Sequence, residues 1–215
     1  MNKNITELIG TYFLVLTIGL TTGVHGTPLA PLAIGSMLMV MVYMGGPISG
    51  AHYNPAVTLA AWMRKKISGS GALSYMLFQV IGSFLAALTV YLIYYKSMIP
   101  PADLPGFQYH LKPLMLEAIF TFALASVVMN VAMSKKSAGN SYFGLAIGFT
   151  VAASAFAAGP VSGGAFNPAV AFGPTLMDTI TGGNSLNHLW FYLVGPFGGA
   201  AAAAIVYKFM NPDEE

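Results

Sequence analysis

A segment of eleven residues that could bind a small molecule occurs twice in this chain of 215 residues. Residues 47–57 read P-I-S-G-A-H-Y-N-P-A-V, and residues 160–170 read P-V-S-G-G-A-F-N-P-A-V. Asparagine is a favoured N-cap and proline is favoured at the first helical position, so each Asn-Pro pair predicts the start of a helix. The asparagine amide can donate hydrogen bonds to a water or hydroxyl oxygen.

Both copies lie in an apolar chain, which is 56% hydrophobic and only 7% charged. A soluble domain normally carries about 25% charged residues, so this composition predicts a bundle of membrane-spanning helices. A polar motif at membrane depth costs free energy, and its duplication therefore indicates a function. The net charge of +2 argues against nucleic acid as a partner, and the absence of cysteine excludes disulfides.

Six long apolar segments are expected to cross the membrane, and two short ones to enter it half-way. The long segments cover residues 5–23, 29–46, 72–95, 113–133, 140–158 and 187–209. The short segments, 55–64 and 168–177, follow the two Asn-Pro pairs. Each would span about 15 Å, which is half of the hydrocarbon core. The predicted fold is therefore an all-α membrane protein with six transmembrane helices and two re-entrant half-helices.

The two halves of the chain resemble each other beyond the duplicated segment. Glu7 precedes Asn54 by 47 residues, and Glu117 precedes Asn167 by 50 residues. Each half would hold three spanning segments, an odd number, so the second half is expected to be inverted in the membrane. Inverted repeats whose broken helices meet at the midplane are one way to build a permeation site. We expect a single domain over 1–215, with repeat halves over about 1–95 and 113–215 joined by a loop over 96–112.

The basic residues predict the orientation of the chain. If the N-terminus is cytoplasmic, seven of the nine basic residues lie inside, and only Lys96 and Lys112 lie outside. The seven are Lys3, Arg64, Lys65, Lys66, Lys135, Lys136 and Lys208. This bias follows the positive-inside rule and puts both termini in the cytoplasm. The short tails favour an integral protein of a prokaryotic inner membrane.

The helix starts at the two motifs have an electrostatic consequence. A helix N-terminus carries a partial positive charge, so two half-helices that face each other would oppose protons and cations inside a pore. The motif residues are Asn54, Pro55, Ala56, Asn167, Pro168 and Ala169. Asp178, close to the end of the second half-helix, is expected to be an exposed polar terminus.

The paired Asn-Pro-Ala motifs resemble those of the aquaporin or major intrinsic protein family, and the resemblance covers nearly the whole chain. The sequence S-G-A-H-Y-N-P-A-V-T over 49–58 is especially similar to the family pattern. The resemblance implies a passive transmembrane channel for water or small neutral solutes, without a cofactor, that assembles as a homotetramer. A facilitator of glycerol, urea, ammonia or peroxide with little water selectivity is the alternative within this family.

The filter that the resemblance implies is unusual. Most aquaporins carry an arginine after the second Asn-Pro-Ala, where this chain has Val170, and the only arginine is Arg64 in a predicted cytoplasmic loop. Counting from the motifs, the filter positions are Ile34, Ala155, Gly164 and Val170, with Leu38, Ser154 and Phe156 as alternatives for the first two. Such a filter would be apolar, wide and uncharged, so solutes larger than water should fit.

Three further polar residues lie close to the motifs. In the resembled family, glutamates placed as Glu7 and Glu117 brace the loops before the motifs. As intramembrane carboxylates they could instead relay protons in a proton-coupled secondary transporter. His52 could brace the first loop or respond to pH. A third alternative for the whole protein is a structural or junction role with a closed pore. No catalytic cluster, metal-ligand spacing or phosphate loop occurs, so we expect no enzyme and no metal site.

Overall fold

The computed structural model of the protein describes residues 1–23, 26–96 and 107–214, with only the backbone of residues 107–110. In these residues there are helices and no strands. The eight α-helices are α1 (Asn2–Ile18), α2 (Ala30–Ser49), α3 (Pro55–Met63), α4 (Gly69–Tyr94), α5 (Phe107–Val128), α6 (Phe143–Ser162), α7 (Pro168–Ile180) and α8 (Leu189–Met210). Short π-helical turns, η1 (Gly19–Gly23) and η2 (Met129–Met133), extend α1 and α5.

Six helices in the described ranges are long and apolar enough to cross a membrane, which confirms the six expected spans. They are α1, α2, α4, α5, α6 and α8, and α3 and α7 are the two short helices that follow the motifs. Large apolar side chains such as Leu73, Leu92 and Phe209 lie exposed on the outside, as expected of an integral membrane protein whose surface faces lipid.

One expected boundary is wrong. Because α5 begins at Phe107, residues 107–112 are helical, although we expected them in the loop over 96–112. Residues 107–112 contain no glycine or proline that would interrupt a helix, and Pro113 does not prevent it. Residues 97–106 of the expected loop lie outside the described ranges.

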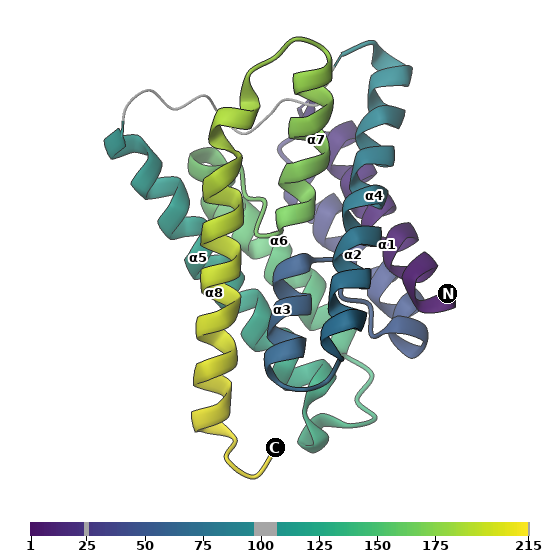
Figure 1. Ribbon diagram of the computed structural model, residues 1–215, viewed down its shortest axis with the longest axis vertical. Helices are drawn as coiled ribbons and strands as arrows, with labels where there is room; N and C mark the ends of the chain where they lie inside the picture. The colour runs from purple at the N-terminus through teal and green to yellow at the C-terminus, as the bar shows by residue number, and fades with distance from the viewer. Residues whose placement is uncertain (24–25, 97–106, 215) are drawn as a thin grey trace.

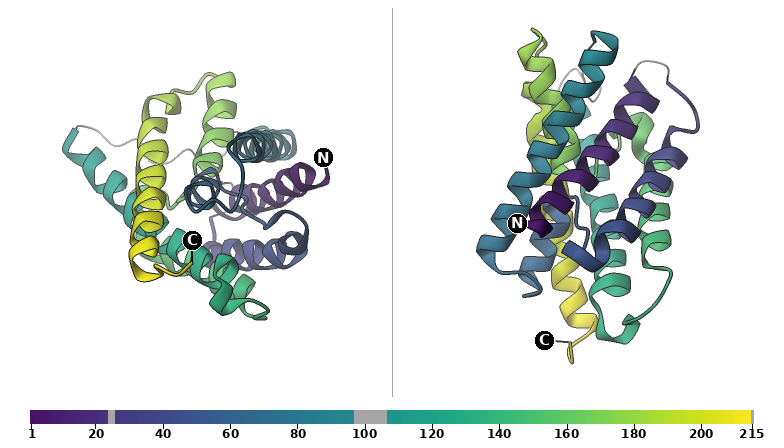
Figure 2. Two further views of the ribbon diagram at one scale, coloured as in Figure 1. Left: turned by 60° about the horizontal axis from the view of Figure 1, so that its bottom comes forward. Right: turned by 90° about the vertical axis from the view of Figure 1, so that its right-hand side faces the viewer.

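The packing of the helices repeats in the two halves. Helix α1 packs against α2 and α4, as α5 packs against α6 and α8. Helix α3 lies against α8, and α7 lies against α4, so each short helix contacts the other half of the chain. The two short helices point to opposite ends of the bundle (Figures 1 and 2). We call the end with Arg64, the loop 134–142 and residues 211–214 the tail face (Figure 1).

Two glycines allow the long helices of each half to approach closely. A Cβ atom on Gly82 of α4 would lie 2.4 Å from the carbonyl oxygen of Leu8 in α1. A Cβ atom on Gly199 of α8 would lie 2.1 Å from the carbonyl oxygen of Ala118 in α5. Small residues are what lets helices associate in lipid, where apolar burial gives little driving force. These contacts fix the positions of the residues just before them, Glu7 and Glu117.

Candidate functional site

The two motif asparagines are the N-caps of the short helices. Asn54 and Asn167 have extended backbone, and each side-chain Oδ1 accepts a hydrogen bond from the N–H two residues later. The bond lengths are 2.8 Å to the N–H of Ala56 and 3.0 Å to that of Ala169. The prolines that follow occupy the first helical position, where no N–H is needed.

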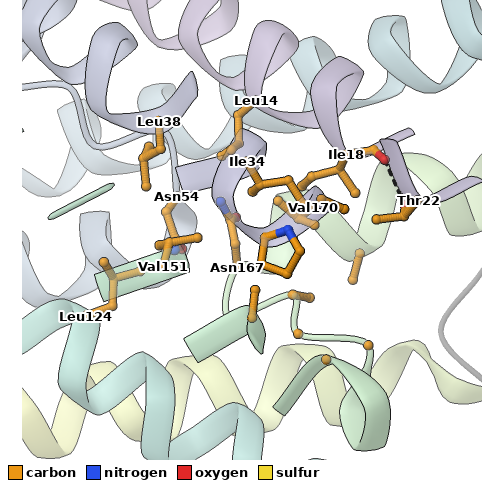
Figure 3. A pocket seen from close by; sticks show the side chains of 18 of the residues that line it. Leu14, Ile18, Thr22, Ile34, Leu38, Asn54, Leu124, Val151, Asn167 and Val170 are labelled. Atoms are coloured by element: carbon orange, nitrogen blue, oxygen red, sulfur yellow. Dashed lines mark hydrogen bonds between the residues drawn. The ribbon is translucent and has the colours of Figure 1, made fainter. Parts of the chain in front are cut away.

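The same two amides also join the halves. Asn54 Nδ2 donates to the carbonyl of Phe166 and Asn167 Nδ2 donates to the carbonyl of Tyr53, both at 2.8 Å. This exchange brings the N-terminal ends of α3 and α7 together, and both asparagines line one cavity (Figure 3). Because each amide has two hydrogens, one N–H of each remains for a molecule in that cavity.

The loop before the first motif is tied to Glu7, a fully buried residue of α1. Its Oε1 accepts from the hydroxyl of Ser49 at 2.6 Å and the N–H of His52 at 3.0 Å. Its Oε2 accepts from the N–H of Tyr53 at 2.7 Å and from Gln79 Nε2 at 2.8 Å. These bonds hold Tyr53 at a positive φ of 48°, a conformation that costs free energy for a residue other than glycine.

The loop before the second motif repeats this arrangement around Glu117, which is also fully buried. Its Oε1 accepts from the hydroxyl of Ser162 at 2.8 Å and the N–H of Ala165 at 3.0 Å. Its Oε2 accepts from the N–H of Phe166 at 2.6 Å, and Phe166 has a positive φ of 47°. In every hydrogen bond that the described residues form with these two carboxylates, the carboxylate is the acceptor. Each carboxylate also fixes the residue directly before a motif asparagine.

His52 belongs to a polar network that the second half lacks. Its Nδ1 lies 3.1 Å from the hydroxyl of Thr58, which donates to the carbonyl of Asn54 at 3.0 Å and accepts from Gln79 Nε2 at 3.0 Å. Since the only proton of this hydroxyl is given to Asn54, Nδ1 must be the donor to Thr58. His52 is half-buried and lines the cavity.

The cavity has a volume of about 500 Å³ and follows the contact between the halves. Its lining includes Thr22 and Thr27, both motif asparagines, His52 and Val128. Most of its wall is apolar, and the lining residues with polar side chains are Thr22, Thr27, His52, Tyr53, Asn54 and Asn167. None of the described residues that line it is acidic, lysine or arginine.

All four expected filter residues line this cavity: Ile34, Ala155, Gly164 and Val170. Ile34 and Val170 are both drawn among the side chains that line the cavity (Figure 3). Of the alternative positions, Leu38 and Phe156 also line the cavity, whereas Ser154 is buried elsewhere and donates to the carbonyl of Thr150 at 2.7 Å.

The sequence also matches a known protein family. Residues 1–207 match the family model of the major intrinsic proteins. The chain belongs to the major intrinsic protein family. Similar sequences include an aquaporin, NIP1-4, of Oryza sativa subsp. japonica, which is 36% identical over 214 residues, covering 96% of this chain and 76% of that one.

One further relative and one solved structure match this major intrinsic protein over nearly their whole length. The glycerol uptake facilitator protein-like 6 of Lactiplantibacillus plantarum is 34% identical over 223 residues, with 100% of both chains covered. The X-ray structure of the aquaglyceroporin from Plasmodium falciparum has a TM-score of 0.76 at 23% identity, covering 99% of this chain and 98% of that one. That structural likeness shows that the fold is shared.

Some residues near the site of this major intrinsic protein were missed or misplaced by the sequence analysis. Gln79, which bonds to both Glu7 and Thr58, is a lone amide in an apolar span, and that contrast could have marked it. Asp178 is 9% exposed and accepts from the N–H of Ser185 at 3.2 Å, so the expected exposed terminus was wrong. Arg64 donates to the backbone carbonyl of Glu214 and does not line the cavity with Val170, so it does not replace the filter arginine.

Proposed function

We propose that this major intrinsic protein is a passive channel for water and small neutral solutes, and that solutes larger than water pass through it. The observation that carries this proposal is the cavity that contains both motif asparagines and has no charged side chain among its described lining residues. A lining of this kind binds a neutral molecule weakly and leaves no counter-charge for an ion. Passive transport of this kind needs no cofactor.

At the centre of the pathway, the free N–H groups of Asn54 and Asn167 would donate to the oxygen of a passing water or hydroxyl. The partial positive charges at the N-terminal ends of α3 and α7 act at the same place. They oppose cations and turn each permeant so that its oxygen faces the amides. A chain of hydrogen-bonded waters would therefore be interrupted there, which hinders proton passage.

The filter would be formed by Ile34, Ala155, Gly164 and Val170. Two of these residues have no more than one side-chain carbon, which leaves width, and none of them carries a charge. The carbonyls around Gly164 would accept hydrogen bonds from hydroxyl or amide groups of the solute. Glycerol or urea would thus find acceptors on one wall and an apolar surface on the other.

A proton-coupled transporter is the rival function, and it requires Glu7 or Glu117 to exchange protons with the pathway. Neither glutamate lines the cavity, and each carboxylate is occupied by donors from the loop before its motif. These contacts support a bracing role for both residues, and His52 would assist through its bond to Thr58.

The orientation and assembly are part of the proposal. The basic residues Arg64, Lys65, Lys66, Lys135 and Lys136 all belong to connections at the tail face. The positive-inside rule therefore supports a cytoplasmic tail face, with both termini inside. We propose an inner-membrane protein of a prokaryote, because a relative that this chain covers over its whole length occurs in a bacterium. We also propose the homotetramer that the family resemblance implies.

The filter assignment is tested by comparing two variants at one position. Val170→Arg adds a long cationic side chain to the cavity lining, whereas Val170→Leu adds bulk without charge and serves as the control. Glycerol and urea flux into proteoliposomes is measured by stopped-flow light scattering, normalised to the amount of folded protein. The proposal predicts that the arginine lowers solute flux by about tenfold and that leucine lowers it far less.

Solute flux that is unchanged in Val170→Arg would contradict the proposed filter. Saturable uptake that a proton uncoupler abolishes would favour the transporter instead.

A further inference from the structure

Residues 211–214, which we call the tail segment, fold back under the bundle and bury a carboxylate. Glu214 is 6% exposed. Its Oε1 accepts from the hydroxyl of Ser134 at 2.5 Å and lies 3.4 Å from the N–H of Lys136. Its Oε2 accepts from the hydroxyl of Tyr207 at 2.6 Å. One side chain thus joins the end of α8 to the loop 134–142.

A second group of contacts adds the far end of α3. The Arg64 guanidinium donates to the backbone carbonyl of Glu214 at 3.3 Å and lies over the ring of Tyr207, 5.4 Å from its centre. Lys136 Nζ donates to Asn211 Oδ1 at 3.2 Å. The tail segment therefore connects Arg64, Ser134 and Tyr207, which lie 70 and 73 positions apart in the sequence.

Helix α3 links this contact to the pore. The N-cap of the helix is Asn54, which lines the cavity, and its C-cap is Arg64, which donates to the tail segment. Its nine residues form a rod of about 14 Å that is too short to bend appreciably. A shift at Arg64 would therefore be transmitted to the position of Asn54.

The end of α5 makes a second link. The π-helical turn η2 follows Val128, which lines the cavity. Two carbonyls of this turn bond to the loop 134–142: Asn130 accepts from the hydroxyl of Ser137 at 2.5 Å, and Val131 accepts from Asn140 Nδ2 at 2.7 Å. Since Ser134 and Lys136 in the same loop are held by Glu214, the tail segment also fixes the wall of the pore.

The burial is specific to one carboxylate of the tail segment. Asp213, the neighbouring residue, is exposed, although it has the same charge. The carboxylate of Glu214 accepts from the hydroxyls of Ser134 and Tyr207 and faces the backbone N–H of Lys136. The Arg64 guanidinium adds a bond to the backbone carbonyl of the same residue. A tail held only by general attraction to basic loops would not select one carboxylate in this way.

We propose that Glu214 is a positioning residue for the pore, acting as a latch that fixes α3 and the end of α5 from the tail face. The inference rests on the proposed function, because its effect appears in the flux. The latch itself can be observed without flux, so the two can fail separately.

The test uses the full chain with four substitutions. Glu214→Gln places an amide NH₂ against a hydroxyl donor, and Glu214→Asp keeps the carboxylate with a shorter reach. Asp213→Asn removes the same charge one residue earlier and is the matched control. Tyr207→Phe removes a single donor and is the substitute if Glu214→Gln does not fold. Hydrogen exchange over residues 134–142 and solute flux per folded channel are measured for each.

We expect exchange in the loop to become faster in Glu214→Gln and solute flux per channel to fall by about fivefold or more, the usual size of coupling between distant elements. Asp213→Asn should match the wild type, and Glu214→Asp should restore part of the flux. Faster exchange with unchanged flux would overturn the positioning role, and unchanged exchange would overturn the latch. A wild type that shows no flux would reject the proposed function, while the exchange result would still test the latch.

Discussion

Replacing Gly199 by alanine should separate two helices that carry the site. The added Cβ would lie 2.1 Å from the carbonyl oxygen of Ala118, whereas ordinary contact begins at 3.4 Å. The backbones of α5 and α8 would have to part by 3.4 − 2.1 = 1.3 Å along this line. Overpacking of this kind costs about 1–3 kcal/mol, which corresponds to a loss of roughly 3–10 °C in the midpoint of thermal unfolding.

The substitution should also reduce transport. Ala118 directly follows Glu117, whose carboxylate holds the N–H of Phe166 at 2.6 Å. A displacement of α5 moves this carboxylate away from the loop before Asn167. We therefore expect Gly199→Ala to lower solute flux per folded channel as well as stability.

The neighbouring glycine provides the control. A Cβ on Gly198 would have nothing within 4 Å, so Gly198→Ala should leave stability unchanged or raise it slightly through helix propensity. Thermal unfolding of both variants in detergent is followed by tryptophan fluorescence, and flux is measured in proteoliposomes. Equal unfolding midpoints for Gly198→Ala and Gly199→Ala would refute the close approach of α5 and α8.

Three other substitutions test single groups. Glu117→Gln places an NH₂ against a donor of the loop and should lower the free energy of unfolding by about 1.5–3 kcal/mol; unchanged thermal stability would contradict the bracing. Hydrogen bonds from Ser134 and Tyr207 lower the pKa of Glu214 to about 2, below an unfolded value of about 4.3. Its stabilisation is therefore complete above pH 4.3 and disappears as the pH falls towards 2, so the stability difference between the wild type and Glu214→Gln should vanish over that range. Asn167→Asp removes the N–H groups and adds a negative charge at the pore centre, and we expect a cation leak in a liposome potential assay; an intact cation barrier would argue against the central role of this amide.

The duplicated features are those that the sequence made predictable. The two asparagines could be placed because each opens a short apolar segment, and Glu7 and Glu117 because they occupy matching positions in the two halves. The order of helices follows from the same repeat. Residues at equivalent positions of the two halves could therefore be recognised from the sequence.

Features without a counterpart in the other half could not be predicted in this way. Thr58 and Gln79 complete the network of His52 only because α3 and α4 pack together, and nothing in either segment indicates the partner. The contact between Glu214 and Ser134 joins residues 80 positions apart through side chains in unremarkable polar connections. Such contacts depend on how the ends of helices meet, which local sequence patterns do not specify.

The most direct test of the central claim is the response of wild-type proteoliposomes to a sudden gradient of glycerol, followed by stopped-flow light scattering. We expect the proteoliposomes to shrink rapidly as water leaves. They should then re-swell much faster than protein-free liposomes, as glycerol enters through the uncharged filter. Shrinkage that is accelerated by the protein without accelerated re-swelling would show a water-selective pore. That result would contradict the claim that solutes larger than water pass beside Val170.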